Sequence, residues 1–285
     1  MSVEPKEITV FLDTSPAARD RAGHAVALAQ RWGARVIGVH LVYAGVMVPP
    51  SLSYALGSAA TRSAIAYEEE LDTEAEAAAA ALSEHFRSLC AQFGVDGEFR
   101  PIGRGQPVED AVLSARHSDL VVIGHPADSN LPEVVSPERF LIAAGVPVLV
   151  IPSIWQGKTI GDRVVIGWNA SREARRAVSD SMTFIVGAKL TTVLVINPAS
   201  TPRHGEEPGA DIALYLARHG ARVTVDRVAS SDGSVAETML HYAADRAADL
   251  LVLGAYSHAR WREILFGGTT RSLLAEIPVP LLISS

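Results

Sequence analysis

The sequence predicts an α/β protein made of two doubly wound domains, each with a five-stranded parallel sheet and helices on both faces. Short apolar runs rich in Val, Ile and Leu alternate with helical stretches, a pattern typical of parallel strands that helices cover on both sides. The chain also repeats itself, because DLVVIGHP at 119–126 corresponds to DLLVLGAY at 249–256. A length of 285 residues suits two domains of ordinary size.

The repeat predicts the same order of elements in both halves. In the first half we expect strands at about 8–13, 36–42, 97–102, 119–124 and 146–151. In the second half we expect them at about 163–168, 190–196, 222–228, 249–254 and 279–284. We place the first domain at 1–153 and the second at 162–285, joined by the link PSIWQGKTIG at 152–161. The last strand of each half would be an exposed apolar edge alone, so we expect these two strands to pack together.

The first strand of each half ends in a polar residue. This residue is Asp13 in the first half and Asn169 in the second, and a serine follows two residues later, Ser15 or Ser171. A serine before a helical stretch is a favoured N-cap, so we expect both serines to begin a helix.

Composition excludes several classes of function. With 25 basic and 32 acidic residues the net charge is −7, which is unlike a nucleic-acid-binding surface. The single cysteine, Cys90, excludes a disulfide framework and a cysteine metal site, and we expect it to pack on a helix face. The nine histidines are scattered without ligand spacing, so we expect no metal site. No apolar run is long enough to span a membrane and the start carries no export signal, so a cytoplasmic protein is expected.

One segment breaks the repeat. After its second strand the first half carries YAGVMVPPSLSYALGSAATRSAI at 43–65, and residues 43–61 contain no charge. We interpret it either as a loop that covers apolar surface or as a lid or small-molecule contact.

The strongest functional pattern is GAYSHARWREILFGGTTRSLL at 254–274. Gly254 ends a strand, and a loop leads to Gly267, Gly268, Thr269 and Thr270, which open a helix. Glycines and free N–H groups at a helix start favour phosphate. The positively charged side chains nearby are His258, Arg260, Arg262 and Arg271. The alternative interpretation is an ordinary helix start with solvated arginines.

These residues and the repeat resemble the universal stress protein family, with two such domains in tandem. The family signature is G-x2-G-x9-G-[ST]; here Ser257 replaces the second glycine and Gly268 stands at the hydroxyl position, followed by Thr269. The resemblance implies a Rossmann-like fold and an adenine contact at the end of the first strand. The positions it assigns to the nucleotide are Trp168, Asn169, Val195, Ile196, Gly254, Ser257, His258, Arg260, Gly267, Gly268, Thr269 and Thr270.

The resemblance implies a stress-response protein that binds ATP or another adenine nucleotide (ADP or AMP), with or without Mg²⁺, in a regulatory or sensing role. We expect the first half to be nucleotide-free, because its loop supplies Glu133, Pro137 and Glu138 in place of the glycines. No catalytic residue is evident, so an enzyme would be at most a slow ATPase. A third hypothesis is a nucleotide-free module that binds a ligand or protein partner through the apolar 43–61 segment.

Overall fold

The computed structural model describes residues 4–42, 57–103, 107–125, 136–157, 159–198, 206–230, 235–254 and 277–285. The strands of its first half are β1 (Glu7–Leu12), β2 (Arg35–Leu41), β3 (Gly97–Ile102), β4 (Leu120–Gly124) and β5 (Val148–Ile151). Those of the second half are β6 (Arg163–Gly167), β7 (Leu190–Ile196), β8 (Val223–Val228), β9 (Leu250–Gly254) and β10 (Leu281–Ser284). Every strand that the repeat predicts is therefore present, with bounds that differ by at most two residues.

Helices connect these strands. The first half contains α1 (Pro16–Trp32), α3 (Gly57–Phe93), α4 (Pro107–Arg116) and α5 (Pro137–Ala143). The second half contains α6 (Arg172–Asp180), α7 (Met182–Gly187), α8 (Ala210–Arg218) and α9 (Val235–Asp245). Within the described ranges, no helix is both long and apolar enough to cross a membrane.

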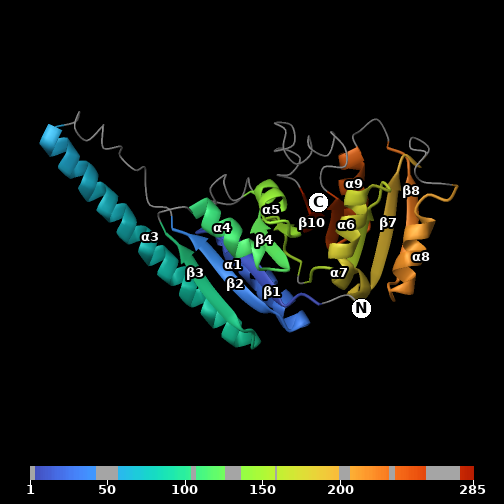
Figure 1. Cartoon of the computed structure of the whole chain (residues 1–285), viewed down its shortest axis with the longest axis horizontal. Helices are drawn as coiled ribbons and strands as arrows, with labels where there is room; N and C mark the ends of the chain where they lie inside the picture. Colours follow the sequence, from blue (N-terminus) through green and yellow to red (C-terminus); the bar gives the residue numbers. More distant parts are fainter. Residues whose placement is uncertain are drawn as a thin grey trace.

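All the described strands belong to one ten-stranded sheet with the order β3-β2-β1-β4-β5-β10-β9-β6-β7-β8. Neighbouring strands are parallel within each half. The halves join where β5 and β10 pair antiparallel, with Leu149 opposite Leu282, so the predicted pairing through the last strands is confirmed. Figure 1 shows the two halves side by side along this sheet.

Two apolar clusters cover the two faces of the sheet. One lies under α1 and α3 in the first half and under α6, α7 and α8 in the second. The other lies under α4 and α5 in the first half and under α9 in the second. Trp32 and Phe184 extend the first cluster across the joint, with their ring centroids 4.8 Å apart. The apolar runs of the sequence are thus buried on both faces, as expected for doubly wound sheets.

The expectation of a loop over 43–65 is wrong for its last part. Residues from Gly57 onward belong to α3, which has 37 residues and is therefore about 55 Å long at 1.5 Å per residue. Its end carries Phe86 and Cys90 into the first apolar cluster, so Cys90 packs as predicted. Figure 1 shows the start of α3 extending well beyond the sheet. Residues 43–56 lie outside the described part of the chain.

Candidate functional site

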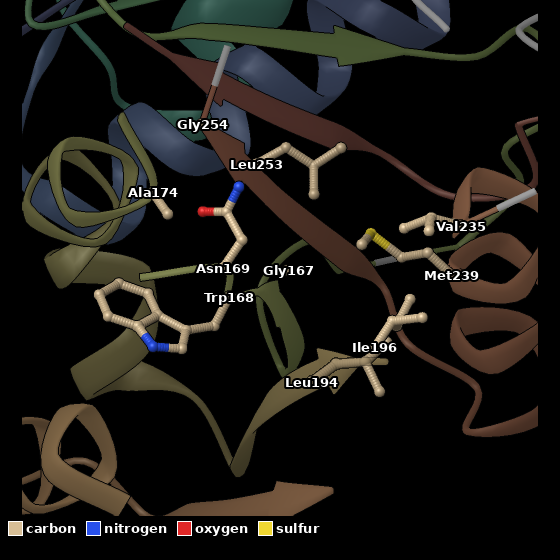
Figure 2. Close-up of a pocket in the computed structure, with 10 residues that line it drawn as sticks. All are labelled: Gly167, Trp168, Asn169, Ala174, Leu194, Ile196, Val235, Met239, Leu253 and Gly254. Atoms are coloured by element: carbon tan, nitrogen blue, oxygen red, sulfur yellow. The ribbon is translucent and has the colours of Figure 1, made fainter. Parts of the chain in front are cut away.

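A pocket of about 40 Å³ lies at the carboxyl ends of the second half's central strands. Ligands of doubly wound sheets bind at this edge, because the strand order reverses there and the connections diverge. The pocket-lining residues are Gly167, Trp168, Asn169, Ala174, Leu194, Ile196, Val235, Met239, Leu253 and Gly254. Figure 2 shows that they come from the ends of β6, β7 and β9 and from the starts of α6 and α9.

A tight turn between β6 and α6 positions Asn169. The Ser171 backbone N–H donates to Asn169 Oδ1 over 3.1 Å, and the Ala174 N–H donates to Ser171 Oγ over 3.1 Å. Between them Ala170 has a positive φ of 56°, which is uncommon for a residue with a side chain. Ser171 is therefore the N-cap that the sequence predicts. Figure 2 shows the Asn169 carboxamide pointing toward Ala174 and Gly254.

Two glycines let the pocket walls approach closely. A Cβ at Gly167 would lie 2.6 Å from Leu253 Cδ2 and 2.7 Å from Met239 Cε. A Cβ at Gly254 would lie 2.6 Å from the Glu173 carbonyl oxygen and closer still to other backbone atoms of α6. Gly254 therefore holds β9 against the first turn of α6, whereas Gly167 keeps space open inside the pocket.

Two charged residues, Arg172 and Glu173, lie beside the turn between β6 and α6 and pair with each other. Arg172 Nε donates to the Glu173 carboxylate over 2.6 Å, and this hydrogen bond lowers the pKa of Glu173. Glu173 is therefore ionised at neutral pH but is accompanied by a guanidinium at the entrance of α6.

The first half has the same turn, but a large side chain stands at the position of Gly167. Strand pairing places Phe11 at the position of Gly167. Ile8 pairs with Leu120 at the start of β4, and Val164 pairs with Leu250 at the start of β9. Phe11 lies three residues after Ile8, as Gly167 lies three residues after Val164. Phe11 is fully buried, and its ring centroid lies 4.6 Å from that of Phe140. A large aromatic side chain thus fills the place that Gly167 leaves open.

Asp13, the counterpart of Asn169, is also engaged. Its Oδ1 accepts a hydrogen bond from the Ser15 N–H over 2.7 Å, and its Oδ2 accepts one from Arg21 Nη2 over 2.7 Å. Ser15 occupies the N-cap position of α1, but its hydroxyl makes no capping hydrogen bond. The second-half position that corresponds to Arg21 is Ala177, so this position of α6 supplies no cation.

Four of the expected site residues meet in the pocket: Trp168, Asn169, Ile196 and Gly254. Figure 2 shows the Trp168 ring on the side away from Met239 and Ile196, and this ring packs against the opposite apolar cluster. The Val195 side chain is buried in that same cluster and does not line the pocket. The expected residues that lie outside the described part of the chain are Ser257, His258, Arg260, Gly267, Gly268, Thr269 and Thr270.

Sequence reasoning missed six of the lining residues, which are Gly167, Ala174, Leu194, Val235, Met239 and Leu253. A glycine inside a strand often marks a close approach, and its replacement of Phe11 in the repeat is a signal for Gly167. Met239 carries no such signal, because a methionine in an apolar helix is usually an ordinary core residue.

Comparison with known proteins supports a family assignment. Residues 162–285 match the model of the universal stress protein family. The universal stress protein Slr1230 of Synechocystis is 26% identical over 150 residues, which are 51% of this chain and 49% of that protein. The chain therefore spans about half the length of this curated relative.

Solved structures are similar as well. A universal stress protein from Archaeoglobus fulgidus has a TM-score of 0.67 at 14% identity, covering 98% of this chain and 96% of its own. Another from Archaeoglobus fulgidus, solved in complex with dAMP, is 20% identical and has a TM-score of 0.35, covering 51% of this chain and 96% of its own. The first of these similarities extends the doubly wound fold over both halves. The sequence match to the universal stress protein family covers the second half, residues 162–285, and the first half is similar to the family in its fold.

Proposed function

We propose that the second half binds an adenine nucleotide at the carboxyl edge of its sheet, in a regulatory or sensing role under stress. The observation that carries the proposal is the difference between equivalent positions of the two halves. Gly167 and Asn169 border a pocket, whereas Phe11 and the Asp13–Arg21 pair are buried and closed at the same place in the first half.

The donor and acceptor groups of Asn169 suit an adenine ring. A carboxamide carries both an N–H donor pair and a carbonyl acceptor, and asparagine pairs with adjacent donor and acceptor atoms of adenine in other complexes. The apolar lining from Leu194, Ile196 and Met239 suits the faces of a base.

The phosphates would extend toward Gly267, Gly268 and Thr269. These residues lie outside the described part of the chain, so their role rests on the sequence pattern, a glycine pair before a predicted helix start. The pocket of about 40 Å³ holds only a few waters at roughly 10–15 Å³ each. A bound base would therefore also rest against residues beyond the described ranges.

Calorimetry with ATP, ADP and AMP, each with and without Mg²⁺, tests the proposal. We expect one nucleotide per chain. Asn169→Leu, which removes the donor and acceptor but keeps the branched shape, should weaken binding at least tenfold, about 1.4 kcal/mol. Asp13→Asn should leave the affinity unchanged. Two equivalent sites would contradict the asymmetry, and no binding of any nucleotide would favour the nucleotide-free module. Phosphate release measured over hours distinguishes simple binding from slow ATP hydrolysis.

A further inference from the structure

A second cavity, of about 190 Å³, lies at the opposite end of the same half. It is lined by the first residues of β6 and β7, by the middle of β8 and by Arg246, just after α9. Its volume is far larger than the roughly 10–15 Å³ that one water requires. Thr192 pairs with Val165, and Val165 belongs to the apolar cluster under α9. The cavity therefore opens on the sheet face that α9 covers.

In the first half, charged side chains fill the position that is equivalent to this cavity. Glu7 pairs with Arg35 as Arg163 pairs with Leu190, so Arg35 and Leu190 are equivalent. Likewise Ile37 pairs with Glu98 as Thr192 pairs with Thr224. The Glu98 carboxylate accepts hydrogen bonds from both Arg35 and Arg100. Three long charged side chains thus occupy the first-half position.

Shorter side chains open the cavity in the second half. Leu190 replaces Arg35, Thr224 replaces Glu98, and Asp226 stands where the first half has Arg100. These replacements remove the ion pairs of the first half and shorten the side chains at the three positions. The side chains that line the cavity therefore differ between the repeats.

Only one of the two lining arginines, both of which are exposed to solvent, pairs with a carboxylate among the described residues. The Asp226 carboxylate accepts a hydrogen bond from the Tyr242 hydroxyl and pairs with Arg246 Nη2 at 3.0 Å. Arg163 also lines the cavity, and among the described residues no carboxylate pairs with its guanidinium. The Thr192 and Thr224 hydroxyl oxygens lie 3.3 Å apart, and Thr192 also hydrogen-bonds the Tyr242 hydroxyl. The two threonine oxygens keep lone pairs that can accept a hydrogen bond from a ligand hydroxyl.

We propose that this cavity binds a small organic monocarboxylate that carries a hydroxyl group. The Arg163 guanidinium would bind the carboxylate through two parallel hydrogen bonds, and the threonine hydroxyls would bind the ligand hydroxyl. The lining side chains alone, two arginines and one aspartate, have a formal charge of one positive, and the Asp249 carboxylate lies beside them, accepting from the Arg163 backbone N–H over 2.7 Å. A phosphate dianion fits less well, because it would face the Asp226 carboxylate. Val165 and Leu190 provide an apolar wall for a short carbon chain.

Titration of the full chain with lactate, followed in ¹H–¹⁵N NMR spectra, tests the proposal. We expect saturable shifts of the Val165, Thr192 and Thr224 amides, and none with lactamide, which has the same shape without the charge. Arg163→Gln should weaken lactate binding at least tenfold, and Arg163→Lys should restore part of it. Arg218→Gln, on α8 against the opposite face, is the matched control and should change nothing.

The first half supplies a variant that closes the cavity. Leu190→Arg combined with Thr224→Glu places the first-half residues in the second half and should abolish the lactate shifts. If this variant does not fold, Arg163→Gln still decides, because it removes charge without filling space. Absence of saturable shifts in the parent, equal binding of lactamide, or unchanged binding in Arg163→Gln would each overturn the proposal. Tighter binding of inorganic phosphate than of lactate would overturn the choice of a carboxylate. The inference is independent of the nucleotide pocket.

Discussion

Arg21 Nη2 donates a hydrogen bond to Asp13 Oδ2 across 2.7 Å, and both side chains are almost completely buried. Arg21 Nε also donates to the Phe11 carbonyl oxygen over 2.9 Å. Burial lowers the pKa of Arg21, and the charge and hydrogen bond of Asp13 oppose that shift. A buried pair of this kind is retained as a unit, because either charge alone would be left uncompensated.

Removing only the Arg21 guanidinium should destabilise the first half. We expect Arg21→Ala to lower the free energy of unfolding of the first half by about 3–5 kcal/mol, because it leaves the Asp13 carboxylate buried without its cation. The double variant Arg21→Ala with Asp13→Asn should recover more than half of this loss, because it reproduces the uncharged second-half pair, Ala177 and Asn169. Urea unfolding measures both, and a double variant no more stable than Arg21→Ala would contradict the explanation.

Gly167 should control access to the nucleotide pocket. A methyl group at this position would contact the ends of the Leu253 and Met239 side chains, which are flexible and can shift. We therefore expect Gly167→Ala to cost little stability but to weaken ATP binding at least tenfold in calorimetry.

The matched change in the first half should behave in the opposite way. Phe11→Ala should cost about 3–5 kcal/mol through loss of buried area and a new cavity, and should leave ATP affinity unchanged. Undiminished ATP binding by Gly167→Ala would show that the base lies elsewhere.

Substitution of Gly254 should destabilise the protein for a different reason. An added Cβ would collide with backbone atoms of Glu173 and Ala174, and backbone cannot rotate away as a side chain can. Gly254→Ala should destabilise the second half by roughly 1–3 kcal/mol. Gly23→Ala is the control, because nothing lies within 4 Å of the added methyl in α1, and it should stabilise the protein by up to about 1 kcal/mol. Equal thermal stability of the two variants would argue against the close contact of β9 with α6.

Cys90 should react with thiol reagents only after unfolding. Its side chain is buried in the first apolar cluster, and burial raises its pKa to about 11, whereas an unfolded cysteine titrates near 8.5. The thiol therefore contributes stability that is present below about pH 8.5 and is lost as the pH rises toward about 11.

Two measurements check this expectation. Labelling with a chromogenic disulfide reagent at pH 8 should follow the global unfolding rate, and Cys90 is the single cysteine, so the signal is unambiguous. Unfolding free energies of the parent and Cys90→Ala should diverge in slope above pH 8.5. Rapid labelling of the folded protein would contradict the burial of this thiol.

The repeat explains how much of the fold the sequence predicts. Its apolar runs locate every described strand, because parallel strands buried on both faces must be apolar throughout. The uncharged segment at 43–61 favours a loop, and this pattern does not indicate the start of α3 at Gly57. The alanines at 59, 60, 64 and 66 are strong helix formers and could have indicated the helix.

The site was predictable only where a position has a local signal. Asn169 and Gly254 stand at strand ends in the second half, as Asp13 and Gly124 do in the first. Comparison of the two halves therefore points to them. Met239 reaches the pocket from α9, and its placement depends on how that helix packs, which no local pattern states. The cavity beside Arg163 is a further case, because its lining depends on replacements on two neighbouring strands, β7 and β8.

The position of β10 in the sheet has a consequence for the order of synthesis. The strand lies between β5 and β9 in the centre of the sheet, yet residues 152–280 separate it from β5. At about 5–20 residues per second, the edge of β5 emerges from the ribosome roughly 6–26 seconds before its partner strand is synthesised. During that interval the nascent first half exposes an apolar edge, and a chaperone or a neighbouring nascent chain can reach it first.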